Sequence, residues 1–286
     1  SAHFGNTKRG SEEPAEARAS GSPVAMGCCM GKEASGAEQR GVNNLSKNKD
    51  NRANTWRATG IVSLRDGNIK EIPGSALDLG PAVKNLDAHN NAITFLPPSI
   101  GDCTKMTRLV LSSNRLPSLP SALGQLTSLK ILILDNNALS SLPPALSQLS
   151  KLEKLSVNGN SLTSLPTSMS SLIKLTFLAV SNNKLTELPA SLGDCGALEE
   201  VEAADNSLTA IPRALGALTR LKRLNLDNNS IPTVPEEVYK GCSSLITLSL
   251  HGNPVDLLVL QKVPGYDEFE ARRADKHGRQ IQGGVM

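Results

Sequence analysis

Aromatic side chains are scarce in this chain, whose 286 residues include 1 Trp, 2 Tyr and 4 Phe. A core must therefore be built mostly from aliphatic side chains in some regular arrangement. Long apolar runs are also missing, because stretches such as residues 131–134 end after four residues, whereas a helix that spans a bilayer needs about 20. The sequence thus predicts no transmembrane helix.

An excess of one charge is absent as well, since 30 Lys and Arg face 27 Asp and Glu, a net charge of +3. This balance argues against a nucleic-acid partner and against a polyanionic tail. The first five residues, Ser1 to Gly5, contain neither a starting Met nor an apolar stretch. They predict no secretory signal and a location in the reducing cytosol.

A motif of the form Leu-x-x-Leu-x-Leu-x-x-Asn-x-Leu-x-x-Leu-Pro recurs along the chain, with six spacings of 23 residues and a final one of 24. Its Asn residues are Asn91, Asn114, Asn137, Asn160, Asn183, Asn206, Asn229 and Asn253. A weaker copy starts at Ile61, which brings the number of copies to nine. This is the leucine-rich repeat signature. It predicts an α/β solenoid, a horseshoe of nine repeats of 23–24 residues with a parallel β-sheet on the concave face.

Each repeat position has a physical role, as copy four illustrates. We expect five leucines of this copy to point inward: Leu129, Leu132, Leu134, Leu139 and Leu142. We expect the residues between them to face solvent: Lys130, Ile131, Ile133, Asp135 and Asn136. The side-chain amide of Asn137 is expected to satisfy backbone groups that no strand pairs with, so that the column of Asn residues forms a ladder.

Both ends of the repeat array depart from the motif, which predicts caps. Trp56 is expected to cover the first coil, and Tyr266 and Phe269, on a C-terminal helix, the last one; the basic, Gly-rich tail after Lys276 is expected to be mobile. The predicted organisation is a disordered segment of translated upstream sequence at 1–25, a disordered lipidation and basic segment at 26–52, the repeat domain at 53–262, and a C-terminal capping helix with a basic tail at 263–286.

Cysteine and histidine offer no catalytic or metal chemistry in this sequence. Cys103, Cys195 and Cys242 occupy positions where other copies carry Leu, so they are interpreted as buried thiols, separated by coils too far apart for a disulfide. His89 and His251 are placed at equivalent concave positions in distant coils. No metal-ligand spacing, phosphate loop or nucleophile with a nearby base appears. We therefore predict no cofactor, no metal, no catalytic residue and no enzymatic activity.

The stretch that begins at Met26 suggests lipid modification of the chain. Removal of Met26 would expose Gly27 for N-myristoylation, with Cys28 and Cys29 beside it as palmitoylation acceptors. A start at Met30 fits the myristoylation motif better but loses both cysteines. A disordered leader with two incidental cysteines is the alternative. Acylation would place the protein at the cytosolic face of a membrane, anchored in the inner leaflet.

Three stretches carry a resemblance to a known class of proteins: Met26 to Cys28, the residues 56–66 before and within the first copy, and residues 265–273 near the end. Together with the repeats, they resemble the plant intracellular Ras-group-related leucine-rich repeat proteins and their animal relatives. The resemblance implies a non-catalytic, lipid-anchored scaffold in signalling by a Ras-type small GTPase. A regulatory or substrate-recognition subunit of a phosphatase or ubiquitin ligase complex is the alternative.

The partner site is expected on the concave face, where several strand positions that point to solvent are apolar. These are Val110, Ile131, Ile133, and Phe177 with Ala179. Charged residues border them in copies seven and eight: Glu199, Glu200, Glu202, Asp205, Lys222 and Arg223. Such a composition is typical of an interface centre and its rim, with Phe177 as the predicted hot spot. The alternative is that β-branched residues favour strands and that the acids form a solvated face.

Overall fold

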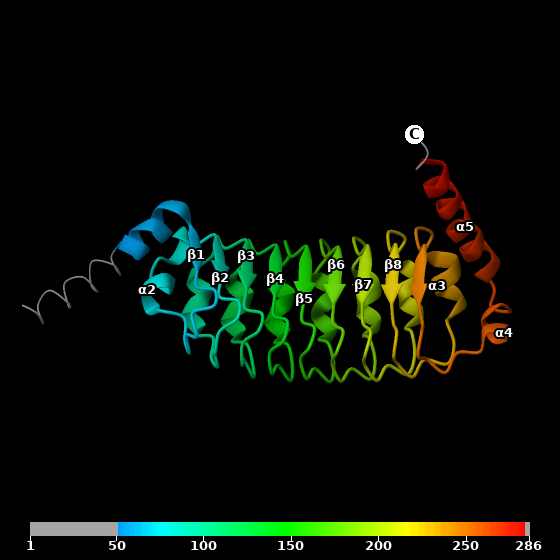
Figure 1. Ribbon diagram of the computed structural model, residues 1–286, viewed down its shortest axis with the longest axis horizontal. Helices are drawn as coiled ribbons and strands as arrows, with labels where there is room; N and C mark the ends of the chain where they lie inside the picture. The colour runs from blue at the N-terminus through cyan, green and yellow to red at the C-terminus, as the bar shows by residue number, and fades with distance from the viewer. Residues whose placement is uncertain (1–50, 284–286) are drawn as a thin grey trace, which may run out of the picture. The chain divides into compact units, whose positions relative to one another are not determined.

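The computed structural model describes residues 51–283, and the side chains of residues 51–275 within that range. A single sheet of nine parallel strands runs through this part of the chain, in the order of the sequence (Figure 1). The strands are β1 (Ile61–Ser63), β2 (Asn85–Asp87), β3 (Arg108–Val110), β4 (Ile131–Ile133), β5 (Lys154–Ser156), β6 (Phe177–Ala179), β7 (Glu200–Glu202), β8 (Arg223–Asn225) and β9 (Thr247–Ser249). The predicted leucine-rich repeat architecture is thereby confirmed.

Equivalent repeat positions pair with one another in every strand-to-strand register. Leu109 lies beside Leu132, and Leu132 beside Leu155, so the middle residues of β1 to β8 form one continuous buried row, which the partly buried Leu248 of β9 extends. The five leucines predicted to point inward in copy four are all buried. The core is therefore a stack of aliphatic layers in which each coil packs on its neighbours, as expected from the scarcity of aromatic residues.

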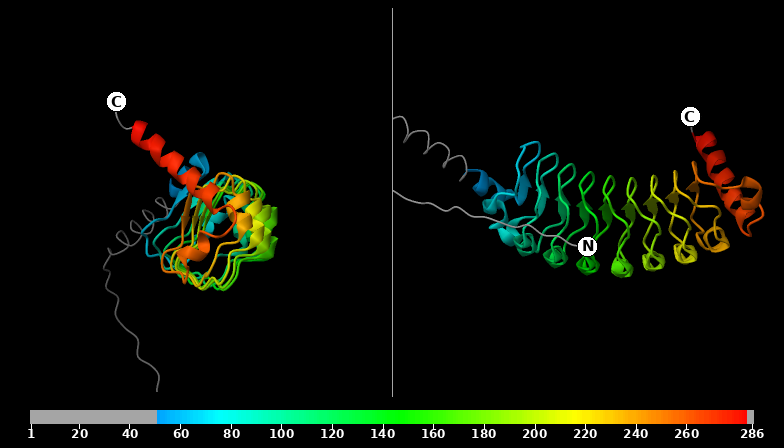
Figure 2. Two further views of the ribbon diagram at one scale, coloured as in Figure 1. Left: turned by 90° about the vertical axis from the view of Figure 1, so that its right-hand side faces the viewer. Right: turned by 90° about the horizontal axis from the view of Figure 1, so that it is seen from below.

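Short 3₁₀ turns form the opposite side of the coils, and Figure 2 shows them on the outer side of the curved row of repeats, with the strands on the inner side. Six of them begin directly after the repeat proline: η2 (Pro98–Asp102), η3 (Ser121–Gln125), η4 (Pro144–Gln148), η5 (Thr167–Ser171), η6 (Ala190–Asp194) and η7 (Arg213–Ala217). Pro143 shows the reason, because its φ of −68° is the value to which its ring restricts it, and its extended backbone delivers the chain into η4. In the other coils this place is taken by α2 (Gly74–Leu77) with η1 (Gly80–Ala82), and by α3 (Glu236–Gly241).

The repeat asparagines hold neighbouring coils together through hydrogen bonds to backbone groups. Asn160 Nδ2 donates to the carbonyls of Leu134, Val157 and Asn158 at 3.0–3.1 Å. Its Oδ1 accepts from the Leu139 backbone N–H at 3.0 Å. One side chain thus serves two consecutive coils. Equivalent bonds are made by Asn91, Asn114, Asn137, Asn183, Asn206, Asn229 and Asn253.

The residue before each ladder asparagine has left-handed backbone geometry. Asn136 has a φ of 55° and Asp205 one of 54°, and Gly159 fills the same position with a φ of 63°. Asn, Asp and Gly tolerate this conformation better than other residues do. The turn therefore explains the Asn, Asp and Gly residues at this position, and Ser113, with a φ of 56°, is the exception.

The N-terminal end of the sheet is covered by helical residues 51–59, with Trp56 only 8% exposed over the first coil. At the other end follow α4 (Leu257–Leu260) and α5 (Tyr266–Gly283). Phe269 and Tyr266 of α5 pack on Tyr239 of α3, with ring centroids 5.5 and 5.7 Å apart. These aromatic side chains lie where caps were predicted. The helical backbone of α5 continues to Gly283, beyond Lys276, where the sequence predicted a mobile tail.

None of the helices in the described range has both the length and the apolar character needed to cross a membrane. Within the same range, no group of three or more His, Cys, Asp or Glu side chains is arranged to hold a metal ion.

Candidate functional site

The open face of the sheet presents parallel rows of side chains, because alternate residues of each strand point away from the core. We call the rows formed by the first and third strand residues the first row and the third row. From β2 to β8 the first row reads Asn85, Arg108, Ile131, Lys154, Phe177, Glu200 and Arg223. The third row reads Asp87, Val110, Ile133, Ser156, Ala179, Glu202 and Asn225.

The apolar side chains that solvent can reach at the centre of this face are Ile131, Ile133 and Phe177, each of them half-buried. Val110 and Ala179 were predicted to be open as well, and this prediction is wrong, because they are only 5% and 1% exposed. Strands lie about 4.8 Å apart, so a short side chain in the third row is shielded by its neighbours in the adjacent strands. The exposed apolar patch is therefore narrower than the sequence suggested.

Phe177, the predicted hot spot, does not stand alone on the sheet. The Lys154 ammonium lies 4.2 Å from the centroid of its ring. A cation over an aromatic face at such a half-exposed place contributes on the order of 0.5–1 kcal/mol. Phe177 and Lys154 therefore act as a pair that presents a charge above an aromatic ring.

The charged residues of copies seven and eight pair with one another across β7 and β8. Glu199 accepts from Lys222 at 2.7 Å and from Arg220 at 3.3 Å, and these cations hold the pKa of its carboxyl below its usual value. Glu200 forms an ion pair with Arg223, which raises the pKa of that guanidinium. Most of the charge on this side of the face is thus neutralised within the protein.

Glu202 and Asp205 differ from these ion pairs. Glu202 accepts a hydrogen bond from Asn225 Nδ2 at 2.7 Å, yet desolvation raises the pKa of its carboxyl, assisted by the nearby charge of Glu200. Asp205 lies at the left-handed turn position, where it accepts from Asn228 Nδ2 at 2.8 Å. Its predicted place among the strand residues is therefore corrected to the edge of the sheet.

A cluster of polar side chains at the end of the concave face escaped the sequence interpretation. The Ser249 hydroxyl donates to Asp227 Oδ1 at 2.7 Å and lies 3.0 Å from Nδ1 of His251. His251 is exposed, and its backbone N–H also donates to Asp227 Oδ1 at 2.7 Å. A serine nucleophile needs its hydroxyl proton directed to the base, whereas here the proton is directed to the carboxylate. The sequence signal was present, because Asp227 and His251 occupy equivalent positions of adjacent copies and Ser249 lies two residues before His251.

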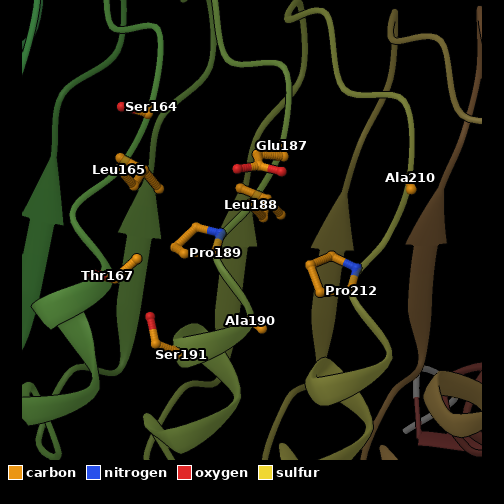
Figure 3. A pocket seen from close by; sticks show the side chains of 10 residues that line it. All are labelled: Ser164, Leu165, Thr167, Glu187, Leu188, Pro189, Ala190, Ser191, Ala210 and Pro212. Atoms are coloured by element: carbon orange, nitrogen blue, oxygen red, sulfur yellow. The ribbon is translucent and has the colours of Figure 1, made fainter.

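A surface hollow lies away from the concave sheet, beside the segments that lead from the strands to the convex side. It is a hollow of about 490 Å³ whose lining comes from three successive coils (Figure 3). Its walls are mainly apolar, with Leu188, Pro189 and Pro212 among them, and the Glu187 carboxylate lies at this hollow too. The buried Ser191 hydroxyl in its lining has no hydrogen-bond partner among the described residues. No sequence motif pointed to this hollow.

The three repeat cysteines are buried free thiols, as predicted. Burial raises the pKa of Cys103, Cys195 and Cys242 to about 11 in each case, with a smaller contribution from Asp102 to Cys103 and from Asp194 to Cys195. The Cys195 thiol donates to the Met169 carbonyl at 3.2 Å. A protonated, buried thiol is neither a nucleophile nor a metal ligand at neutral pH. The predicted acylation residues Gly27, Cys28 and Cys29 lie outside the described residues.

Comparison with known proteins agrees with the observed architecture. The sequence pattern of the family described as "Leucine-rich repeat region" matches residues 119–252. The described part of the chain is therefore a leucine-rich repeat solenoid. It is similar to the plant intracellular Ras-group-related LRR protein 7 of Oryza sativa subsp. japonica, with 41% identity over 89 residues. The matched segment covers 31% of this chain and 29% of the relative. A second rice protein, number 8 of the same series, is 35% identical over 76 residues, which make up 27% of this chain and 19% of the relative.

These matches confirm the resemblance to the Ras-group-related proteins that the sequence suggested. The matched part of the chain spans less than a third of the length of these curated relatives. Among solved structures, it is similar to a leucine-rich repeat protein of Leptospira interrogans, with a TM-score of 0.62, 29% identity, and coverage of 72% of this chain and 56% of that one. It is also similar to the Arabidopsis receptor kinase HAESA, solved in complex with the peptide hormone IDA and the co-receptor SERK1. That match has a TM-score of 0.57 and 31% identity, and covers 64% of this chain and 32% of that one.

Proposed function

We propose that this leucine-rich repeat protein is a non-catalytic scaffold whose concave face holds a protein partner. The observation that carries the proposal is the half-buried apolar group of Ile131, Ile133 and Phe177 on the central strands of the open face. An interface centre of this kind, with charged residues around it, is typical of protein recognition. The similar repeats of HAESA, seen together with a peptide hormone and a co-receptor, agree with this use of the fold.

The polar cluster of Ser249, His251 and Asp227 does not favour a catalytic alternative. Its hydroxyl proton is held by the carboxylate, and the imidazole is exposed to solvent. The cysteine thiols lie in the core, with pKa values raised by burial to about 11. The proposed activity is therefore binding, and the partner supplies any chemistry.

Substitution of Phe177 by Ala tests the proposal. Partners are first captured on the full chain, identified, purified and then titrated against both proteins. We expect Phe177→Ala to weaken binding by about 30-fold, which corresponds to the roughly 2 kcal/mol of a hot spot. The melting temperature should change little, because the side chain lies on the open face.

Phe95→Ala is the matched control, since Phe95 is 62% exposed and lies outside the strands. It loses the same ring from the surface and should bind the partner like the unmodified chain. Undiminished binding by Phe177→Ala, or an equal loss in both variants, would move the partner site away from the concave sheet.

We further propose that acyl groups on Gly27 and on Cys28 or Cys29 tether the scaffold to the cytosolic face of a membrane. A single myristoyl chain binds membranes only marginally, so a second acyl group would make the attachment stable. The test is fractionation of cells that express the chain from Met26. Gly27→Ala should release it to the soluble fraction, and Gly31→Ala in a second chain expressed from Met30 tests the alternative start. Membrane association that survives both substitutions would refute the tether.

The identity of the captured partner also distinguishes between the two proposed signalling roles. The name of the rice relatives motivates the proposal of a Ras-type small GTPase as partner. Recovery of a phosphatase or ubiquitin ligase subunit in place of a GTPase would favour the regulatory-subunit alternative.

A further inference from the structure

Some cations on the concave face have an acidic partner within the chain, and others do not. Four basic side chains form ion pairs with carboxylates of neighbouring coils: Arg65 with Asp87, Lys130 with Glu153, Lys222 with Glu199, and Arg223 with Glu200. Across the part of the chain that the structure describes, Arg108 and Lys154 form no ion pair. Lys84, immediately before β2, also lacks one. Unmatched positive charge therefore gathers over β2 to β5.

These unpaired cations flank the exposed apolar group. In the first row, Arg108 of β3 pairs in register with Ile131 of β4, and Ile131 with Lys154 of β5. At a strand spacing of about 4.8 Å, the backbone positions of the two cations lie about 10 Å apart, with the isoleucine between them. Ile133 lies on the same strand as Ile131, two residues on, and Phe177 follows on β6 beneath the Lys154 ammonium.

We propose that the concave partner presents an acidic segment in which carboxylates flank an apolar side chain, and that Arg108, Ile131 and Lys154 bind it. The proposal rests on the concave-face function above and specifies the chemistry of its partner. The apolar side chain would pack on Ile131 and Ile133, while its flanking carboxylates meet Arg108 and Lys154.

Desolvation is the physical reason for choosing an acidic partner. Arg108 and Lys154 are half-buried already, and an apolar partner side chain on Ile131 would remove more water from their charged groups. A neutral or basic segment would leave these cations covered and unmatched, which costs free energy, whereas carboxylates compensate the loss of water. Of the acids in the same region, Glu153 pairs with Lys130, and Asp135 accepts from Ser156 at 2.6 Å, so neither forms an ion pair with Arg108 or Lys154.

The acidic side chains around β7 and β8 differ from the unpaired cations of β3–β5 in that they already have partners within the chain. On β7 and β8, Glu199 and Glu200 are balanced by cations, and Glu202 is bound by an amide. An acidic segment would therefore be attracted to β3–β5 and would gain little over β7 and β8. This contrast fixes where along the sheet the segment binds.

A random peptide library displayed on phage and selected against the full chain tests the proposal even while the natural partner is unidentified. We expect enrichment of Asp or Glu on both sides of an aliphatic or aromatic residue. The binding of the enriched peptides is then measured by fluorescence anisotropy. Arg108→Glu and Lys154→Glu should each raise the Kd at least tenfold, and the Kd should rise with salt concentration.

Lys184→Glu is the matched control, because Lys184 is an exposed cation that lies beyond the ladder asparagine and outside the strands. It changes the net charge by the same amount and should leave the Kd within about twofold. Melting curves of all three variants establish that they are folded.

The outcomes separate the two proposals. If Phe177→Ala abolishes binding of the enriched peptides but Arg108→Glu and Lys154→Glu do not, the concave site stands and the acidic assignment is wrong. Enrichment of basic or uncharged peptides would also overturn it. Equal displacement of the peptides by inorganic polyphosphate would show a generic polyanion site with no need for the apolar residue. Binding that ignores Phe177 as well as the charges would refute both proposals.

Discussion

Replacement of Asn160 by Leu probes the asparagine ladder at a buried position in the middle of the repeat array. Leu has a similar size but can neither donate nor accept a hydrogen bond. The Leu139 backbone N–H would lose its partner, the Asn160 Oδ1 at 3.0 Å. The Leu134 and Val157 carbonyls would each lose one bond but keep another, from Asn137 at 2.9 Å and from Asn183 at 3.0 Å. The result is a single orphaned buried donor.

The unpaired N–H of Leu139 determines how much stability the substitution costs. An unsatisfied buried N–H costs about 1–3 kcal/mol, while the shared carbonyls add little. For a chain of this size, each kcal/mol lowers the melting temperature by about 2–4 °C. Asn253→Leu is the matched variant, because Asn253 Oδ1 accepts from the Ile231 backbone N–H at 2.9 Å in the same way. Asn253 is half-exposed, so water can replace its bonds and we expect a smaller loss of stability.

Urea unfolding followed by circular dichroism compares the two variants through their midpoints and slopes. Asn160→Asp adds a further arm, because a carboxylate oxygen would face the Leu134, Val157 and Asn158 carbonyls in place of the amide group. It should destabilise the fold at neutral pH and recover as the carboxylate is protonated. Equal losses for Asn160→Leu and Asn253→Leu, or a harmless Asn160→Asp, would refute this account of the ladder.

Three further predictions concern the core, the acidic side of the face and the C-terminal cap. In a Cys28→Ser, Cys29→Ser background, the remaining thiols should resist labelling by a thiol reagent until the chain unfolds, because burial raises their pKa to about 11; rapid native labelling would contradict this. Burial raises the pKa of Glu202 in the folded protein, so its ionised form at pH 7 destabilises the fold. Glu202→Gln should therefore raise the melting temperature at pH 7 and have no effect well below the ordinary pKa of 4.5. The opposite pH trend would contradict the raised pKa. Phe269→Ala should lower the free energy of unfolding by about 3 kcal/mol and speed amide exchange in α5, because this buried ring packs on Tyr239. Unchanged exchange in α5 would show that Phe269 does not hold this helix on the last coil.

The repeat period made most of the fold predictable. A fixed spacing of leucines and asparagines determines which residue of each coil faces the core, so the row through Leu132 and the bonds of Asn160 follow from one copy of the motif. The same regularity placed the three cysteines in the core. Trp56 and Phe269 could be assigned to the ends because a stack of coils needs covers and these are among the few aromatic residues of the chain.

Exposure and pairing across coils were harder to read from the sequence. Val110 alternates with buried Leu109, which predicts an open position, but shielding by neighbouring strands depends on the lengths of side chains in other copies. Likewise, the 23-residue period places Glu200 beside Arg223, but only the structure shows that their side chains form an ion pair with each other. The contact of Ser249 with His251 was readable, since residues two apart on a strand share a face, but it was not recognised.

Site-specific photo-crosslinking tests the central claim, that the concave sheet holds the partner, most directly. A photoreactive phenylalanine derivative is placed at Ile133 on β4 or, as a control, at Thr167, which is exposed on η5 of the convex side. The full chain carrying either residue is irradiated with the purified partner. The account predicts a covalent adduct from position 133 and none from position 167. An adduct from position 167 alone would show that the partner binds the convex side and would contradict the account.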